Sequence, residues 1–374
     1  MKIGMVCYPT YGGSGIVATE LGIELAKMGH EVHFISYALP TRLNNFQDNV
    51  FFHDVEIPNY PLFEFHLYTL ALVGKIIDVV KYEKIDILHV HYAIPHAVSG
   101  YLARQILMKD YNLKLVTTLH GTDITLIGLE PGFHPIIKFS LEHSERITAV
   151  SSYLREKTIQ HFNTGKDIDV IPNFVDTLIY KRQEYPELKK QIAPNDEKIL
   201  IHISNFRTVK RVCDVVKIFN EVLKKIPSKL LLVGDGPDRI AAENLAGELG
   251  IQKHIKFLGK QTSLVELLSI SHVFLLPSQS ESFGLSALEA MSCGVPVVAS
   301  NIGGIPEVVD HNETGFVAEL GDVSRMARYT IELLEKPKKW EGFSINARKR
   351  AVELFDIKLI VPRYENLYRE LLEP

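Results

Sequence analysis

The stretch PSQSESFGLSALEAMSCGVPVV, from Pro277 to Val298, decides the fold together with the apolar residues beside it. The apolar run Val273–Leu276 precedes it, and a second run, Val295–Ala299, lies at its end. Short, continuously apolar runs are typical of strands buried in a parallel sheet. The stretch therefore predicts a strand–helix–strand unit in which residues 282–285 start the helix.

The same alternation of strand and helix occurs in two series along the chain of 374 residues. We expect strands in the first series at 2–9, 31–36, 86–92, 113–119 and 146–151, and in the second at 199–203, 229–233, 255–259, 273–276 and 295–299. A polar segment between residues 171 and 197 separates the series. The pattern predicts an α/β protein of two doubly wound, Rossmann-like domains, residues 1–172 and 173–355, with a helix at the chain's end.

Composition excludes several classes of protein. The net charge of −4 favours neither a nucleic-acid partner nor stable association with an anionic membrane. The three cysteines (Cys7, Cys213 and Cys293) are far apart, so neither a disulfide framework nor a zinc knuckle is indicated. The first strand starts at Lys2, which leaves no room for a signal peptide, and no apolar run approaches the about 20 residues that span a bilayer. We expect a cytoplasmic protein.

Glycines follow the first strand. Gly12–Gly15 precede a helix expected at 16–30, and glycines before a helix N-terminus let the backbone approach an anion. A tight turn between strand and helix explains the same residues equally well. The segment matches neither the GxGxxG of dinucleotide folds nor a P-loop, which weakens the dehydrogenase and NTPase interpretations.

Histidines follow two later strands of this series. His89 and His91 lie on one face of a strand, and His96 would be a third zinc ligand, but no acidic or thiolate partner is spaced to complete the site. We therefore favour packing and hydrogen bonding for these histidines, and no metal. Segment 119–123, LHGTD, places a histidine, a threonine and an aspartate after a strand, which indicates polar contacts to a hydroxyl-rich ligand.

The second series has a basic cluster after its first strand, formed by Arg207, Lys210 and Arg211. A helix N-terminus is already partly positive, so cations there suggest a bound polyanion such as a diphosphate. A solvated helix start is the alternative. The glycine turn Gly234–Gly236 is explained by a structural loop.

Two glutamates frame the opening stretch. The free N–H groups of residues 282–285 favour a phosphate, and Glu281 just before them is placed to accept hydrogen bonds from sugar hydroxyls. Glu289 lies on an apolar side of the helix, where a carboxylate needs donors, and a ribose diol would supply two. A capping charge and a surface glutamate remain the alternative.

At this point the motifs resemble a known family. ESFGLSALEA is similar to the E-x7-E motif of the retaining glycosyltransferases of family 4, and GGSG, LHGTD, VIPNFVD, LLVGDGP and GVPVVASNIGGIPEVV extend the resemblance over nearly the whole chain. The resemblance implies the GT-B fold, in which two Rossmann-like domains face each other across an interdomain cleft. Residues 1–172 would bind the acceptor and 173–355 the nucleotide sugar, and a final helix at about 356–374 would cross back onto the first domain.

The resemblance also implies roles for single residues. The donor-binding set is Gly13, Asn205, Arg207, Lys210, Glu281, Phe283, Gly284, Leu285 and Glu289. The catalytic residues would be His120 and Glu281, and the acceptor-binding candidates are Ser14, Tyr92, Thr118 and Arg42. The family often has Gly-Arg where this chain has Ser204-Asn205, so the cation of residues 207–211 that meets the diphosphate stays open. No metal is expected, because in this family the departing phosphate is thought to accept the acceptor's proton.

Within the family, CYPTYGGSGIVATELG, HVHYAIPHA, TLHGTDIT and SNFRTVKR resemble the members that act in bacillithiol biosynthesis. These transfer N-acetylglucosamine from UDP-N-acetylglucosamine to the hydroxyl of L-malate. A transferase with another acceptor, such as a lipid or a sugar, a UDP-sugar epimerase of the same fold and a non-catalytic binder of nucleotide sugars are the alternatives. A homo-oligomer is expected by analogy only.

Overall fold

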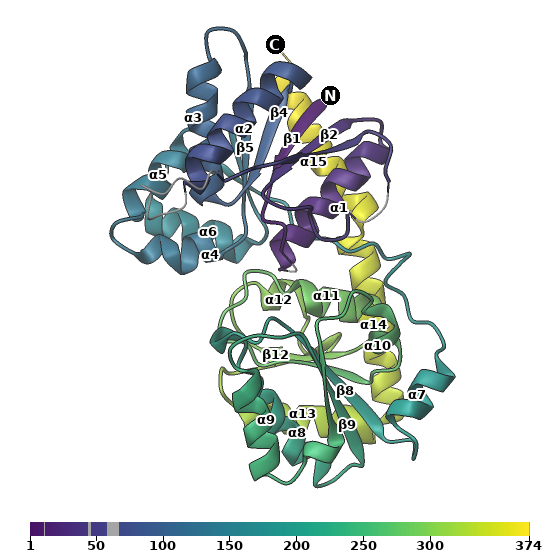
Figure 1. The fold of residues 1–374 in the computed structure, drawn as a ribbon. Helices are drawn as coiled ribbons and strands as arrows, with labels where there is room; N and C mark the ends of the chain where they lie inside the picture. Colours follow the sequence, from purple (N-terminus) through teal and green to yellow (C-terminus); the bar gives the residue numbers. More distant parts are fainter. Residues whose placement is uncertain (11, 44–45, 58–66, 374) are drawn as a thin grey trace. The chain divides into compact units, whose positions relative to one another are not determined.

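The computed structural model describes residues 1–10, 12–43, 46–57 and 67–373 (Figure 1). Contacts within the chain divide it into two compact units. Unit 1 contains Met1–Asn173 and Lys358–Pro374, and unit 2 contains Phe174–Ile357. No helix in the described part of the chain is long and apolar enough to cross a membrane.

Unit 1 is built on a seven-stranded sheet with the strand order β3-β2-β1-β4-β5-β6-β7. Its strands are β1 (Lys2–Val6), β2 (Glu31–Ser36), β3 (Val50–Asp54), β4 (Ile87–His91), β5 (Lys114–Leu119), β6 (Arg146–Ala149) and β7 (Ile168–Val170). Its helices are α1 (Gly13–Lys27), α2 (Tyr68–Glu83), α3 (Val98–Leu107), α4 (Thr122–Thr125), α5 (His134–Glu142), α6 (Ser152–Phe162) and, from the end of the chain, α15 (Ile357–Leu372).

Unit 2 is built on a six-stranded sheet with the order β10-β9-β8-β11-β12-β13. Its strands are β8 (Lys198–Ile203), β9 (Ser228–Val233), β10 (Ile255–Gly259), β11 (Val273–Leu276), β12 (Val297–Ser300) and β13 (Gly315–Ala318). Its helices are α7 (Pro186–Ile192), α8 (Val212–Leu223), α9 (Arg239–Glu248), α10 (Val265–Ser269), α11 (Leu285–Ser292), α12 (Ile305–Val308), α13 (Val323–Glu335) and α14 (Pro337–Phe355).

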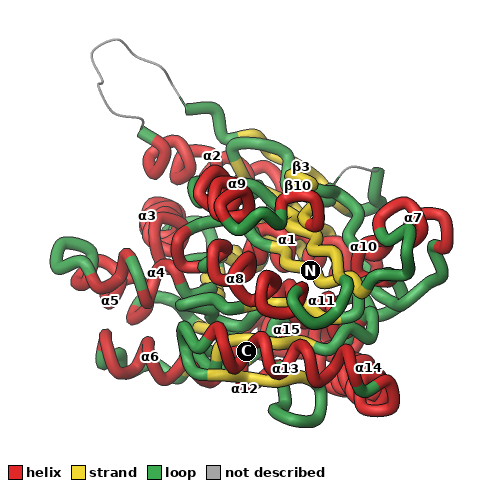
Figure 2. The backbone as a smooth tube through the Cα atoms, turned by 90° about the horizontal axis from the view of Figure 1, so that it is seen from below, coloured by secondary structure: helices red, strands yellow, loops and turns green. Residues whose placement is uncertain are grey.

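All neighbouring strands in both sheets run parallel, and helices enclose the strands (Figure 2). In unit 2, α8, α9 and α13 cover one face of the sheet, and α11 and α14 cover the other (Figure 1). Val215 and Phe219 of α8 pack with Leu230 and Leu232 of β9 in the core. The strands are therefore nearly continuous apolar runs, as expected for a sheet that is buried on both faces.

The two sheets share one topological feature. In each, the strand order reverses next to the first strand of the unit, between β1 and β4 in unit 1 and between β8 and β11 in unit 2. Open parallel sheets bind ligands outside the carboxyl ends of their strands, in the crevice at such a reversal. The loops after these four strands are therefore where functional residues are expected.

Two helices begin at residues other than those predicted. Helix α1 begins at Gly13, so the glycine-rich segment forms its first turn instead of preceding it as a flexible turn. Gly15 allows this, because a Cβ there would lie 2.6 Å from the backbone oxygens of Tyr8 and Thr10. Helix α11 begins only at Leu285, after Gly284 with a φ of 97°, a backbone conformation that glycine adopts at little cost.

Helix α15 packs against the sheet of unit 1, and the yellow helix runs close to β1 in Figure 1. Tyr364 and Tyr368 of α15 are fully buried, and the Tyr368 hydroxyl lies 2.6 Å from Nδ1 of His89 on β4. Nε2 of His30 lies 2.9 Å from the carboxylate of Glu365. The last residues of the chain thus complete the core of its first unit.

Candidate active site

The crevice of unit 1 brings together two of the predicted acceptor residues. Ser14 lies in the first turn of α1, and Tyr92 directly follows β4. The Tyr92 hydroxyl donates a hydrogen bond to Oγ of Ser14 at 2.8 Å. Tyr92 has a φ of 90°, and its N–H donates to the carbonyl of Thr118 at 2.9 Å, which fixes the backbone where β4 ends. The pair lies at the β1–β4 reversal, the position favoured for a ligand.

His120 follows β5 and lies beside this pair. The buried His91 holds its ring in place. Nε2 of His120 lies 2.8 Å from Nδ1 of His91, and the two rings are stacked. The ring of Tyr92 lies 5.3 Å from that of His120. Burial, which penalises the charged imidazolium, lowers the pKa of His120 to about 3. His120 is thus a neutral, oriented ring at the crevice.

Thr118 does not reach the surface of the crevice. Its side chain is fully buried, and its hydroxyl lies 2.6 Å from both Nε2 of His89 and Oγ1 of Thr148. The family resemblance implied Thr118 as an acceptor contact, but at this position in β5 its side chain points into the interior. We therefore leave it out of the acceptor site.

The aspartate of segment 119–123 also has a structural role instead of the predicted ligand contact. Asp123 is 2% exposed, and its carboxylate accepts hydrogen bonds from the N–H groups of Ala93 at 2.8 Å and Gly121 at 3.1 Å. Burial raises the pKa of Asp123 to about 6, although these N–H groups oppose the shift. Asp123 ties the loop after β4 to the loop after β5. Thr122, by contrast, is exposed.

Arg42, the proposed cation of the acceptor site, is half-buried and forms an ion pair with Glu20 of α1. Any bound anion must therefore share its guanidinium with that carboxylate. Among the histidines in and after β4, Nδ1 of His96 contacts the carbonyl of His91 instead of converging with the rings of His89 and His91.

The loops after β8 and β11 contact each other at the crevice of unit 2. Nζ of Lys210 lies 2.6 Å from Oε1 of Glu281, and the same oxygen accepts a hydrogen bond from Ser278 at 2.9 Å. The N–H of Gln279 donates to the carbonyl of Val209 at 2.7 Å. Two predicted donor-binding residues of opposite charge thus meet at the reversal point, with both side chains partly exposed.

The remaining cations near this crevice differ in their surroundings. Arg211 has a φ of 52° and forms an ion pair with Asp214 at 2.5 Å. Arg207 is exposed, as is the predicted donor residue Asn205. Among the described residues, Arg207 has no ion-pair partner, and Lys210 contacts Glu281, itself a predicted donor-binding residue, whereas Arg211 is paired with the buried Asp214. Arg207 and Lys210 are therefore the better candidates for the diphosphate.

A glycine pair that sequence reasoning did not assign to the site holds Glu281 in place. The N–H of Gly304 donates to the Glu281 carbonyl at 3.0 Å. Gly303 has a φ of 58°, and a Cβ on it would lie 1.9 Å from that same carbonyl oxygen. The signal was present as NIGGIPE after an apolar run, but only the fold shows that this loop packs under Glu281.

Helix α11 positions the rest of the predicted donor set. Phe283 is buried with its ring against Phe355, and Gly284 and Leu285 form the helix start, so the amide groups of this turn lie beside Glu281. Glu289, one turn into the helix, is 4% exposed. The prediction that this carboxylate lies on the apolar side of the helix is confirmed.

The glycine turn after β9 packs against the loop after β8, as its interpretation as a structural loop implied. Gly234 has a φ of 121°, and a Cβ on it would lie 1.7 Å from the carbonyl oxygen of Ser204. Any other residue would displace the segment that carries Asn205 and Arg207. Gly234 therefore supports the loop after β8 at this crevice.

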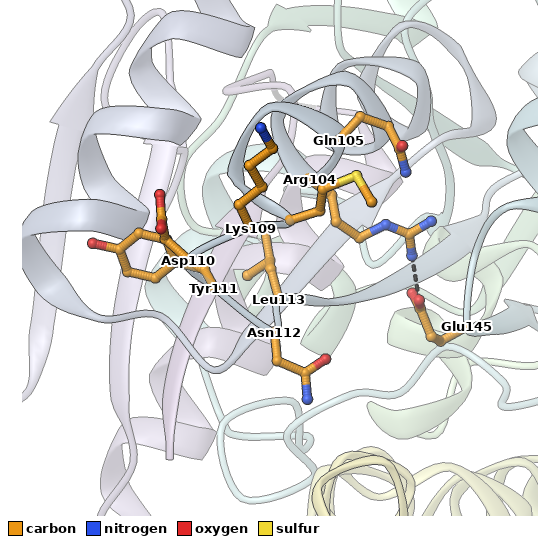
Figure 3. A pocket seen from close by; sticks show the side chains of 9 residues that line it. Arg104, Gln105, Lys109, Asp110, Tyr111, Asn112, Leu113 and Glu145 are labelled. Carbon is orange, nitrogen blue, oxygen red and sulfur yellow. Dashed lines mark hydrogen bonds and ion pairs between the residues drawn. The ribbon is translucent and has the colours of Figure 1, made fainter.

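Unit 1 has a surface pocket of about 560 Å³ at the amino ends of β5 and β6 (Figure 3). It is lined by residues from the end of α3 to the start of β5, and by Glu145 before β6. An ion pair joins Arg104 to Glu145 at its wall (Figure 3). None of the predicted site residues lines it, and it lies at the amino ends of the strands, so we do not assign it to the active site.

Comparison with known proteins identifies the class. Residues 11–177 match the family model described as Glycosyltransferase Family 4, and residues 184–350 match the one described as Glycosyl transferases group 1. The chain belongs to glycosyltransferase family 4. It is 46% identical over 373 residues to the N-acetyl-alpha-D-glucosaminyl L-malate synthase of Bacillus anthracis, a match that covers 100% of this chain and 97% of the relative.

Solved structures confirm the fold class. Sucrose-phosphate synthase from Thermosynechococcus elongatus superimposes with a TM-score of 0.82 at 21% identity, covering 99% of each chain. HepE of Anabaena, solved with UDP and glucose, has a TM-score of 0.83 at 22% identity, covering 99% of this chain and 100% of that one. The two parallel α/β sheets are those of the GT-B glycosyltransferases, as predicted.

Proposed function

We propose that the protein transfers N-acetylglucosamine from UDP-N-acetylglucosamine to the hydroxyl of L-malate, with retention of the anomeric configuration. The observation that carries this proposal is the 46% identity to the N-acetyl-alpha-D-glucosaminyl L-malate synthase of Bacillus anthracis over essentially the full length of both chains. The reaction would take place in the cytoplasm as a step of bacillithiol biosynthesis.

The unit 2 crevice supports the donor half of this proposal. Lys210 and Arg207 supply positive charge for the diphosphate, and Glu281 with the amides of Phe283 and Leu285 would hold the sugar. Glu289 would accept hydrogen bonds from the ribose hydroxyls, which would add donors to its buried carboxylate. Asn205 would complete the contacts from the loop after β8.

The unit 1 crevice supports the acceptor half. L-Malate is a small dianion with one hydroxyl, and the first turn of α1 combines free amide groups, including that of Gly13, with the Ser14 hydroxyl. Tyr92 adds a second hydroxyl, and Arg42 adds a cation shared with Glu20. His120 would contact the sugar near its anomeric carbon.

The chemistry needs no protein base in this proposal. The bond between the anomeric carbon and the phosphate oxygen breaks, and a bond to the malate hydroxyl oxygen forms on the same face. The hydroxyl proton passes to the departing phosphate. Lys210 and Arg207 would stabilise the negative charge that develops on UDP, because fixed charges aimed at a leaving group lower the barrier.

The test is the release of UDP from UDP-N-acetylglucosamine in the presence of EDTA, with and without L-malate, followed by the mass of the product. Succinate, which lacks the hydroxyl, is the matched control and should give no release above background. We expect malate-dependent release and the mass of an N-acetylhexosaminyl malate. Donor binding without malate-dependent release would refute the acceptor assignment, and conversion of the donor alone would favour an epimerase.

A further inference from the structure

A second cluster of chemically reactive side chains lies near the outer edge of the unit 1 sheet. His33 on β2 and His53 on the edge strand β3 share a face, because Ile35, two residues after His33, pairs with His53. Nδ1 of His33 lies 2.9 Å from Nε2 of His53. Glu83, the last residue of α2, completes the group, and the three ligand atoms lie within 4.8 Å of one another.

This donor set suits a transition metal. Neutral imidazole nitrogen and carboxylate oxygen are ligands of Zn²⁺, and tetrahedral bonds of about 2.0–2.1 Å place neighbouring ligand atoms about 3.3 Å apart. The two nitrogens lie 2.9 Å apart, slightly closer than this value, and the carboxylate oxygen of Glu83 lies within 4.8 Å of the ligand nitrogens. Rotations of the half-buried His53 and Glu83 side chains would bring the three atoms onto one ion, while a water molecule could fill the fourth position.

An outer carboxylate orients the buried ring of this group. Oε1 of Glu31 lies 3.0 Å from Nε2 of His33, and a carboxylate can only accept, so Nε2 carries the hydrogen. The lone pair of His33 is then on Nδ1, which faces Nε2 of His53. Glu31 is itself held by Nζ of Lys2 at 2.6 Å. Histidines that bind metals commonly donate their second N–H to a carboxylate in this way.

We propose that His33, His53 and Glu83 form a binding site for one divalent transition-metal ion of the Zn²⁺ type. Without an ion, the N–H of His53 Nε2 donates to Nδ1 of His33. On binding, the hydrogen of His53 would move to its Nδ1, and the ion would take its place between the two nitrogens and join β2, β3 and α2. The inference is independent of the transferase assignment, because none of the three residues belongs to the proposed donor or acceptor site.

The ion would stabilise the exposed edge of the sheet. All five residues of β3 are at least partly exposed, and the strand pairs on one side only, with β2. Strands at such edges depend on additional contacts. A metal that binds the folded state but not the unfolded one raises the melting temperature with its concentration.

The experiment is a titration of the metal-free, full-length protein with Zn²⁺ by calorimetry, with a parallel Co²⁺ titration followed by visible absorption. We expect one ion per chain, a higher Tm with Zn²⁺, and a tetrahedral Co²⁺ spectrum. His53→Gln and Glu83→Gln should abolish the spectrum and the Tm shift. Glu31→Ala, which removes only the outer carboxylate, should weaken binding about 10–100-fold.

The matched control is His143→Gln, because His143 directly follows α5, outside this cluster and the proposed active site. It should bind Zn²⁺ like the unmodified protein. His33 is avoided as a test position because it is fully buried. Zn²⁺ binding that His53→Gln and Glu83→Gln leave unchanged, or the absence of binding at one ion per chain, would overturn the proposal.

Discussion

Nδ1 of His91 lies 2.8 Å from Nε2 of His120, so a fully buried ring orients the ring at the crevice. The other nitrogen of His91 lies 3.1 Å from the thioether sulfur of Met5, which can accept a hydrogen bond but cannot donate one. His91 therefore carries its hydrogen on Nε2 and accepts at Nδ1. It follows that His120 donates from Nε2 and presents the lone pair of Nδ1 to a ligand.

We expect nitrogen NMR shifts of the free protein to show His120 protonated at Nε2. Met5→Leu keeps the apolar volume but removes the acceptor for His91, so it should give a mixture of the two tautomers of His120. Turnover of this variant should fall while UDP affinity stays the same. A wild-type His120 that carries its hydrogen on Nδ1 would contradict the assignment.

Variants of Lys210 and Glu281 should distinguish the contact to the diphosphate from the contact to the donor sugar. Lys210→Met should weaken the binding of both UDP and UDP-N-acetylglucosamine by about 1.5–3 kcal/mol, because a charged hydrogen bond to phosphate is lost. Glu281→Ala should instead abolish turnover without weakening UDP, since it removes a sugar contact and frees Lys210. Calorimetric titration of both ligands checks this, and equal losses for both variants would speak against distinct roles.

Glu289 is predicted to bind the ribose. Glu289→Ala should weaken UDP binding by about 1–3 kcal/mol through the loss of charge-assisted hydrogen bonds. The same substitution should have little effect on 2′,3′-dideoxy-UDP, which lacks the hydroxyls. Because Glu289 is 4% exposed, the melting temperature of the variant is the necessary control. Unchanged UDP affinity in a folded variant would show that the ribose assignment is wrong.

Tyr92 should act on the acceptor alone. Tyr92→Phe keeps the ring but removes the hydroxyl that contacts Ser14, a change of about 0.5–1.5 kcal/mol for one neutral hydrogen bond. We expect the KM for L-malate to rise several-fold while the Kd of UDP stays constant. Steady-state kinetics with varied malate measures this, and a change confined to UDP would place Tyr92 in the donor site instead.

The buried histidines make the fold sensitive to acid. Burial lowers the pKa of His89 and His120 to about 3, and that of His96, His202 and His272 to about 4. Their contribution to stability is complete above the unfolded-state pKa near 6.5. It is lost as the pH falls toward these values, because only the unfolded chain takes up protons.

Each such histidine should reduce the free energy of unfolding by about 1.4 kcal/mol per pH unit below about pH 6.5. The raised pKa of Asp123 acts in the opposite direction, and it offsets at most the loss of unfolding free energy that one histidine causes. Urea denaturation at pH 7 and pH 5 measures how the free energy of unfolding changes with pH. His120→Gln should reduce this change by the contribution of one histidine. Equal stability at the two pH values would refute the prediction.

The central strands could be predicted from the sequence, whereas three of the four edge strands, β3, β7 and β13, could not. The predicted ranges 31–36 and 273–276 coincide with β2 and β11. The strands β3 and β13 lie at sheet edges, and β3 is partly exposed along its whole length, so it lacks the continuous apolar run that marks a buried strand.

The candidate site was predictable as separate residues but not as pairs. Strand ends indicated Ser14, Tyr92, Lys210 and Glu281 one by one, because parallel sheets bind ligands there. That they meet as two contacting pairs depends on which strands are neighbours, which a single sequence does not show. Thr118 shows a second limit of prediction from sequence. Side chains alternate between the two faces of a strand, so a shift of one residue decides whether a side chain near the strand's end points outward or into the interior.

The hydrogen bond between Tyr368 and His89 joins residues 279 positions apart, across the whole of unit 2. During synthesis, residues 174–357 emerge as a continuous folding unit, whereas the first unit waits for the last helix of the chain. Contacts of such long sequence separation form slowly. The segment made first should therefore be the last to reach its native state, and a nascent chain arrested before α15 would leave His89 uncovered beneath the crevice of unit 1.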